Sequence, residues 1–234
     1  MELLKKMYAI CSPSNDENEI KAFIRKQIQH LPLSIEEDEY GNLFITKGTA
    51  ENYPCIAAHL DEVHIPTERI IHEEEGRIFA TDNDFQPTGC GADDKNGIWI
   101  ALQLLECCSA LKVALFICEE RGCVGAHNCD LRWFDNVRYV IECDRKGNSD
   151  FIINGRGQEL CDSSFIPETI LTEFNYFPSN GYTTDVVVLR ERGLSVPCCN
   201  LSCGYHNPHS EDEYTNIADL HNCLLMVKKI IHTL

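Results

Sequence analysis

The chain has 234 residues, a formal net charge of −17 and a hydrophobic fraction of 44%. A hydrophobic fraction of this size can fill a core, which excludes a disordered chain. The acidic residues are spread along the whole sequence, and such a surface repels nucleic acid, so DNA and RNA are excluded as partners.

Fourteen cysteines are a second unusual feature of the composition. The opening MELLKKMYAI does not resemble a secretory signal peptide, and no segment reaches the roughly 20 apolar residues that a membrane span needs. The cysteines form no C-x-x-C pair, which argues against a zinc site made of thiolates. We therefore expect a cytoplasmic protein that does not bind membranes and whose cysteines are reduced core residues.

The first fifty residues predict two helices and a hairpin. One helix covers the opening ten residues. Ser14 and Glu17 have the spacing of a capping box, which predicts a second helix that continues to about Leu31. The expected hairpin has extended segments at 35–39 and 43–47 around a turn at 40–42.

Beyond residue 50 the sequence alternates between strand and helix patterns. The expected strands are 55–60, 112–118, 137–143, 150–154 and 196–202, and the expected helices lie at 96–108, within 160–174, at 184–192 and at 216–233. This alternation predicts an α/β fold, a three-layer sandwich with a mostly parallel central sheet flanked by helices. The sequence contains no repeat and no linker, so we expect a single domain over residues 1–234.

Acidic and imidazole side chains follow the expected core strands. They are His59 and Asp61 after the first, Glu119 and Glu120 after the second, Asp144 after the third, His206 and His209 after the last, and Asp93 in a glycine-rich turn at 89–97. The reactive groups of such sheets gather beyond the carboxyl ends of the strands. Carboxylates that share one site repel each other unless a cation is present. Imidazole and carboxylate donors without thiolate suit zinc, manganese or cobalt.

Six segments carry a resemblance to a known family. The chain resembles the co-catalytic zinc exopeptidases, which include peptidase T, the carboxypeptidase G-like enzymes and the zinc aminopeptidases. The matching segments are AHLDEV ending at Val63, GCGADDKNG (89–97), CEERGCVGA (118–126), IECD (141–144), GYTTDVVVL (181–189) and GYHNPHSEDEY (204–214). Each segment alone is weakly specific, but their order and their positions after strands make the resemblance specific.

The resemblance implies two divalent metal ions, zinc first, with cobalt or manganese as alternatives. His59 would bind one ion, and Asp61 would hydrogen-bond that imidazole and fix its tautomer. Asp93 would bridge the two ions, one oxygen to each. The family pattern also predicts a cis peptide bond between Asp93 and Asp94.

The same resemblance gives the remaining residues their roles. Glu119 would be the general base that takes a proton from the attacking water. Glu120 would bind one ion and Asp144 the other. The last ligand is open between His209 and His206, and the spacing to a following Glu-Tyr pair favours His209. His206 would then contact substrate or lie on the surface.

One departure from the family concerns the segment after Asp144. Larger members carry an inserted domain there, whereas this chain has only about forty residues, which predicts a minimal enzyme without a lid or dimerisation domain. The residues that would distinguish amino-end from carboxyl-end recognition are lost with it. Arg145 or Arg156 could bind a free carboxylate, although a solvated surface charge is the simpler reading of both. Asp185 is expected to have a structural role at a helix start.

Three functions remain open from the sequence. The first is a metallo-exopeptidase, an aminopeptidase or small-peptide peptidase whose substrate is a short peptide. The second is a deacylase of N-acyl amino acids with the same metal centre. The third is a catalytically silent domain that keeps the fold for binding, which the intact set of ligands and base disfavours.

Overall fold

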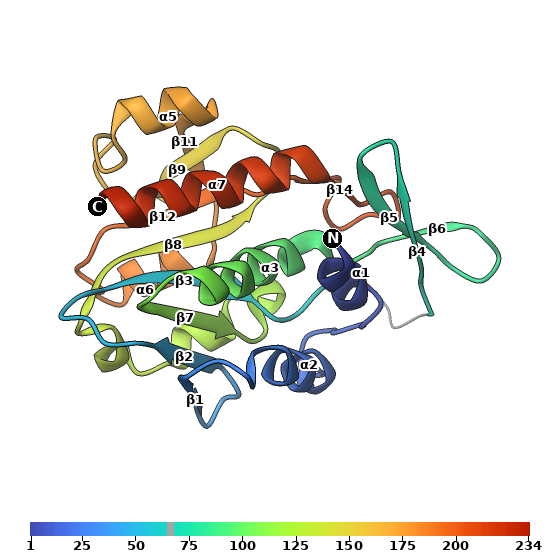
Figure 1. Ribbon diagram of the computed structural model, residues 1–234, viewed down its shortest axis with the longest axis horizontal. Helices are drawn as coiled ribbons and strands as arrows, with labels where there is room; N and C mark the ends of the chain where they lie inside the picture. Colours follow the sequence, from blue (N-terminus) through green and yellow to red (C-terminus); the bar gives the residue numbers. More distant parts are fainter. Residues whose placement is uncertain (65–67) are drawn as a thin grey trace.

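A twisted central sheet organises the molecule (Figure 1), and the computed structural model describes residues 1–64 and 68–234. Its strands run in the order β1 (Leu33–Glu37), β2 (Leu43–Lys47), β7 (Leu111–Phe116), β3 (Tyr53–His59), β8 (Val137–Arg145), β12 (Cys198–Ser202), β9 (Asp150–Gly155) and β10 (Gln158–Glu159), and β11 (Phe177–Gly181) pairs with β9. The four central strands, β7, β3, β8 and β12, are parallel, and the antiparallel pairs lie toward the edges. The predicted α/β fold with a mostly parallel centre is confirmed.

Helices cover both faces of this sheet and make the outer layers of the sandwich (Figure 1). One hydrophobic core joins the sheet to α1 (Glu2–Tyr8), α2 (Asn18–Ile28), α3 (Ala92–Cys107), α5 (Glu168–Phe174) and α7 (Ile217–Thr233). A second core joins the other face to α4 (Val124–Asn128) and α6 (Asp185–Glu191). The central strands are apolar along their whole length because both of their faces are covered.

The N-terminal elements match the prediction except at the start of the second helix. The hairpin β1–β2 pairs Leu33 with Lys47 in an antiparallel register. The capping box is wrong, because α2 begins after Glu17 and has no side-chain cap. Ser14 instead donates to the Asp61 carboxylate at 2.6 Å, and the Glu17 carboxylate accepts from the backbone of Cys118 at 3.2 Å. Both side chains are used by long-range contacts rather than by the helix end.

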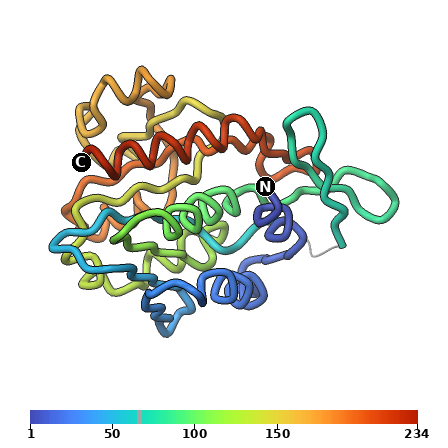
Figure 2. Tube along the Cα trace, in the orientation of Figure 1, coloured from blue at the N-terminus to red at the C-terminus, as the bar shows by residue number. Residues whose placement is uncertain are grey.

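A second, smaller sheet projects beyond the central one, at the right of the tube in Figure 2. It consists of β4 (Ile70–Glu74), β5 (Arg77–Thr81), β6 (Pro87–Thr88), β13 (Tyr205–His206) and β14 (Tyr214–Asn216). The sequence did not predict it. Its strand β14 pairs with β5, although the two are far apart in the chain, so the segment that carries the late histidines is joined to the segment before the glycine-rich turn.

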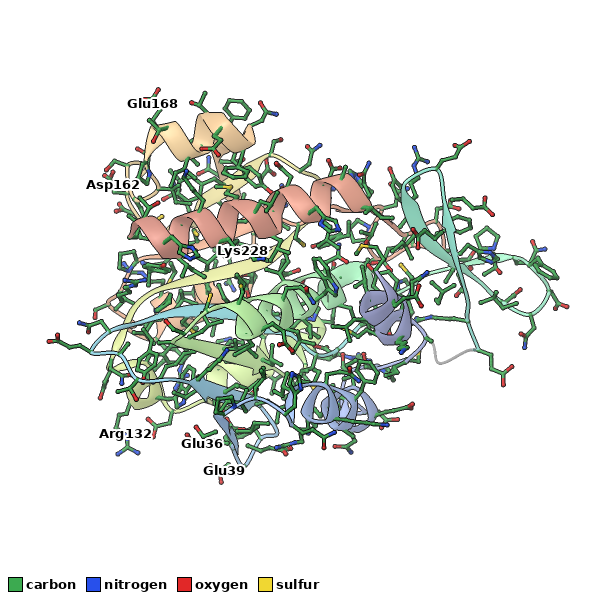
Figure 3. The ribbon with its side chains drawn as sticks, in the orientation of Figure 1. Glu36, Glu39, Arg132, Asp162, Glu168 and Lys228 are labelled. Carbon is green, nitrogen blue, oxygen red and sulfur yellow. The ribbon has the colours of Figure 1, made fainter. Side chains whose placement is uncertain are left out.

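The acidic residues and the cysteines that are frequent in the composition occupy different parts of the molecule. Acidic side chains labelled in Figure 3, such as Glu39 and Glu168, extend outward from the periphery, and both residues are exposed. Twelve of the cysteines are buried with free thiols. In the described part of the chain, no helix has both the length and the hydrophobicity that crossing a membrane requires.

Candidate metal centre

The carboxyl ends of three adjacent parallel strands deliver the predicted residues to one edge of the sheet. His59 is the last residue of β3, and Asp144 is the penultimate residue of β8. The short 3-10 helix η1 (Glu119–Arg121) follows β7 and holds both predicted glutamates. Three groups of histidine and acidic donors there have their ligand atoms within 4.8 Å of one another: His59–Asp94–Asp144, His59–Glu119–Glu120 and Asp93–Glu120–His209.

The glycine-rich turn presents Asp93 at the start of α3. The Asp93–Asp94 peptide bond is cis, as predicted, and both residues have non-helical backbone angles. Gly91 precedes them with a φ of 66°, and a Cβ there would lie 2.2 Å from Glu62 Oε2 and 2.6 Å from Lys95 Nζ. A residue with a side chain therefore cannot replace Gly91 without moving the charged pair beneath the turn.

Asp93 divides its two oxygens between two sets of donors. Its Oδ1 lies 3.1 Å from His59 Nε2, which is itself 3.6 Å from Asp144 Oδ1. Its Oδ2 lies 3.2 Å from His209 Nε2, which is 3.0 Å from Glu120 Oε1. We call the first set, His59 and Asp144, the buried half and the second set, Glu120 and His209, the outer half.

The buried half is fixed by hydrogen bonds from several elements. His59 Nδ1 lies 2.9 Å from the Asp61 carbonyl oxygen, and because a carbonyl only accepts, Nδ1 carries a proton and Nε2 faces Asp93 and Asp144. The His59 backbone N–H donates to Asp94 Oδ2 at 3.2 Å. The His59 side chain is only 1% exposed, so its orientation is set by the protein and not by solvent.

The outer half is more open. The His209 side chain is 53% exposed, and its residue has a left-handed backbone with a φ of 61°. Its two acidic neighbours, Asp93 and Glu120, raise the pKa of His209 to about 10. The structure thus brings His209 into the cluster. His206 lies elsewhere, where it contacts Asp219 at 3.3 Å and stacks on Tyr214.

Asp61 connects the imidazole of the buried half to the two glutamates. Its carboxylate accepts the backbone N–H groups of Glu119 at 2.8 Å and Glu120 at 3.2 Å. Asp61 also contacts the His59 imidazole, mainly through its carbonyl oxygen at 2.9 Å, whereas the nearest carboxylate oxygen is 3.4 Å away. The Asp61 side chain therefore orients η1 while its backbone orients the histidine.

The pKa of Glu119 lies close to neutral pH rather than in the ordinary range of a carboxyl group. Its burial raises the pKa to about 8, and the charges of Asp144 and Glu120 act in the same direction, whereas His59 opposes them. A pKa near the working pH is the optimum for a general base. Cys123 donates its thiol to Glu119 Oε1 at 3.3 Å.

A cleft of about 260 Å³ opens over these groups. Its lining includes Glu119 and four of the predicted ligands, Asp93, Glu120, Asp144 and His209, so these side chains border a space that a substrate can enter. Other residues of the wall are Arg145, Lys146, Ile152, Gly181, Tyr182, Thr183, Thr184, Asn200, Tyr205 and Pro208.

Asp144 is held in place by Asn200 and Tyr205, two residues that the sequence analysis did not identify. The Asn200 side chain accepts the Asp144 backbone N–H at 2.9 Å and donates to its carbonyl at 2.8 Å, beside the place where the β8–β12 register shifts. The Tyr205 hydroxyl donates to Asp144 Oδ1 at 3.1 Å. Tyr205 belongs to the GYHNPHSEDEY segment, so the resemblance marked its position but not its partner.

Glu213 holds the turn that carries Asp93. It is buried, and its carboxylate accepts the backbone N–H groups of Gly91 at 2.7 Å and Asp93 at 3.2 Å and lies 3.1 Å from His64 Nε2. The spacing between His209 and Glu213 drew attention in the sequence, and the structure supplies its physical reason. The segment 204–214 therefore contributes both His209, a predicted metal ligand, and Glu213, which positions the turn that carries Asp93.

Asp185, by contrast, makes no capping bond. It begins α6 and is fully buried, but its carboxylate oxygens have no hydrogen-bond partner in the described part of the chain. Asp185 thus stands at the start of a helix, as expected, but it does not cap that helix. Burial raises the pKa of this carboxyl well above its usual range, with Glu142 acting in the same direction.

The donor set fits divalent metal ions. All of its ligand atoms are imidazole nitrogens or carboxylate oxygens, and Asp93 has one oxygen toward each half. The bonds that already fix His59, Asp61 and Asp144 are of the kind that orients metal ligands from behind. Buried carboxylates at this density repel each other strongly without a cation.

Comparison with known proteins gives the fold but not a family. No protein-family model matches the sequence. Aminopeptidase PepT from Bacillus cereus ATCC 10987 superposes with a TM-score of 0.82 at 15% identity, covering 97% of this chain and 96% of that one. A tripeptidase from Staphylococcus aureus subsp. aureus Mu50 gives 0.79 at 15% identity over 98% and 96%. Aminopeptidase APDkam598 from the archaeon Desulfurococcus kamchatkensis gives 0.74 at 17% identity over 100% and 94%. The chain therefore has the fold of these aminopeptidase and tripeptidase structures.

Proposed function

We propose that the chain is a dinuclear metallo-exopeptidase, an aminopeptidase or small-peptide peptidase, whose catalytic domain is formed by residues 1–234. The observation that carries the proposal is the arrangement of Asp93, which has one oxygen toward His59 and the other toward His209. A shared carboxylate between two sets of nitrogen and oxygen donors is what two adjacent ions require. Zinc suits these donors, with cobalt or manganese as alternatives.

The residues would divide the work as follows. His59 and Asp144 would hold one ion, Glu120 and His209 the other, and Asp93 both. Bound divalent ions of this kind acidify water and polarise a peptide carbonyl. Glu119 would take the proton of the attacking water on its carboxylate and pass it to the nitrogen of the leaving amine. Asp61 would keep Glu119 and His59 in register through the bonds described above.

The shape of the cleft supports a small substrate. Its volume of about 260 Å³ accommodates only a few residues, since small-molecule sites commonly measure roughly 300–1,000 Å³. The fold agrees, because the structures that superpose on this chain include an aminopeptidase and a tripeptidase. Buried free thiols fit the reducing cytoplasm as the place of action.

A peptide panel with free and blocked amino ends tests the proposal. The purified chain is loaded with zinc, cobalt or manganese and incubated with each peptide, and the released residues are identified by mass spectrometry. Stepwise release from peptides with a free amino end is the expected result. Hydrolysis of N-acyl amino acids without hydrolysis of the peptides would favour the deacylase alternative, which no feature of the described residues supports. Absence of both binding of these metals and hydrolysis would leave only a silent binding domain.

A further inference from the structure

Two consecutive cations lie in the wall of the acidic cleft. Arg145 is the last residue of β8 and Lys146 follows it, directly after the proposed ligand Asp144. Among the described residues that line the cleft, these two are the lysines and arginines. In a chain with a net charge of −17, the cleft therefore contains two adjacent cations beside its acidic side chains.

Asp150 orients the Arg145 guanidinium through its Nε and leaves the terminal N–H groups available. Its Nε donates to Asp150 Oδ2 at 2.9 Å, and its side chain is 24% exposed. Its carbonyl accepts the Cys203 backbone N–H at 2.9 Å, which fixes the main chain. The terminal amino groups of the guanidinium make no hydrogen bond with any described residue. A guanidinium held by Nε alone can still offer its outer N–H groups to a carboxylate.

Lys146 is an exposed charge on a turn whose backbone is hydrogen-bonded. It is exposed and has no ion pair within residues 1–64 and 68–234. Its carbonyl accepts the Ser202 hydroxyl at 2.8 Å, and the next residue, Gly147, donates its N–H to the Tyr205 carbonyl at 2.8 Å. Lys146 and Pro208 also border a second, polar cavity of about 330 Å³, so both residues belong to the wall of each space.

We infer that Arg145 and Lys146 form a subsite for a carboxylate on the leaving side of the scissile bond. The inference rests on the proposed function and specifies its substrate class. The negative carboxylate of a short peptide is attracted to the two cations. Because the cleft is small, it can hold the scissile bond and this carboxylate together only in peptides of a few residues. The carboxylate comes from the carboxyl terminus or from an acidic side chain near it.

A matched set of peptides tests the subsite. The set contains trialanine as the free acid, trialanine amide, and the amide with aspartate as its last residue. Each is assayed with the wild type, Lys146→Gln, Arg145→Gln and the control Lys26→Gln, in the metal-loaded full chain. Lys26 is a suitable control because it is also exposed and unpaired among the described residues but lies on α2.

The wild type should cleave the free acid with a lower KM than the amide. Loss of either cleft cation should raise the KM for the free acid roughly tenfold to a hundredfold, as expected for a charged hydrogen bond, and should reduce the preference over the amide. Lys26→Gln should keep the wild-type preference. Cleavage of the aspartate amide with the KM of the free acid would identify a side-chain carboxylate as sufficient; a KM like that of trialanine amide would identify the terminus.

Two results would overturn the inference in different ways. Equal cleavage of acid and amide by the wild type, or an unchanged preference in both cleft variants, would remove the subsite and leave the peptidase in place. Failure to cleave any peptide with any of the three metals would remove the proposed function, and the subsite with it.

Discussion

The two halves of the candidate metal centre share Asp93 but are built differently. In the buried half, His59 is 1% exposed and bonded on its far side to Asp61, and Asp144 is held by Asn200 and Tyr205. In the outer half, His209 is 53% exposed on a loop. A donor that is fixed before binding loses less conformational entropy when a ligand arrives. The buried half should therefore hold an ion more tightly than the outer half.

The largest expected effect concerns Glu119, which lies close to His59 of the buried half and to Glu120 of the outer half. Glu119→Gln should reduce turnover by a factor of roughly 10²–10⁴, the usual contribution of a general base. The metal content should not change, because the amide is nearly isosteric and Glu119 is not assigned as a ligand. Single-turnover kinetics and metal analysis of the same preparation measure both quantities. Retained turnover would remove Glu119 as the base.

The support beneath the glycine-rich turn should be the next most sensitive feature. Glu62 is buried between Arg69 and Lys95, with contacts of 2.7 and 2.8 Å. Burial alone would raise its pKa, but Lys95 and Arg69 outweigh burial and hold the pKa at about 2. Glu62→Gln would leave both cations buried and unpaired, which should cost about 3–5 kcal/mol of unfolding free energy. Denaturant unfolding measures this loss.

The stabilisation that Glu62 provides through Arg69 and Lys95 should depend on pH. Because the folded pKa of Glu62 is depressed from an ordinary value of 4.5, its stabilisation is fully present above that pH and is lost as the pH falls toward 2. The difference in unfolding free energy between wild type and Glu62→Gln should narrow over this interval. Glu39→Gln, at an exposed residue, serves as the control and should show no such change. A constant difference from pH 7 to pH 3 would contradict the assignment.

Removing one histidine from each half compares the halves directly. His209→Ala should keep one tightly bound ion, because the buried half is intact. His59→Ala should weaken that ion more than roughly 100-fold, beyond the usual effect of a residue that supports a ligand. Isothermal titration calorimetry with zinc gives the affinity of each variant for the metal, and metal analysis gives the number of bound ions. Loss of the same ion in both variants would show that the halves are not distinct.

Tyr205→Phe should have the smallest effect and should be confined to the buried half. It deletes the hydroxyl that donates to Asp144 Oδ1 and leaves the ring in place. Loss of a partner of this kind weakens metal binding about 10–100-fold. Tyr214→Phe is the matched control, since Tyr214 stacks on His206 and does not line the cleft. Equal weakening in both variants would assign the effect to general stability.

Those parts of the molecule that depend on local patterns could be predicted from the sequence. Apolar runs of strand length gave β3, β7 and β8, and parallel strands place their carboxyl ends at one edge. That rule alone brought His59 and Asp144 together. The cis bond after Asp93 came from the family pattern, not from the residues themselves.

The features that were missed depend on contacts between distant segments. The strand β14 pairs with β5 through a register that no local pattern shows. Ser14 and Glu17 have the spacing of a helix cap, but Asp61 and the Cys118 backbone compete for them in the folded chain. The choice between His209 and His206 also needed the fold, because both follow the same strand and only the loop geometry separates them.

The most direct test of the account is a crystal of the full chain grown with manganese or zinc, with anomalous difference maps measured at the metal edge. Two peaks are expected about 3.5–4 Å apart, one on each side of Asp93. The peak between His59 and Asp144 should keep full occupancy at metal concentrations that deplete the peak between Glu120 and His209. No peak in the cleft, or a single peak that Asp93 does not contact, would contradict a dinuclear centre.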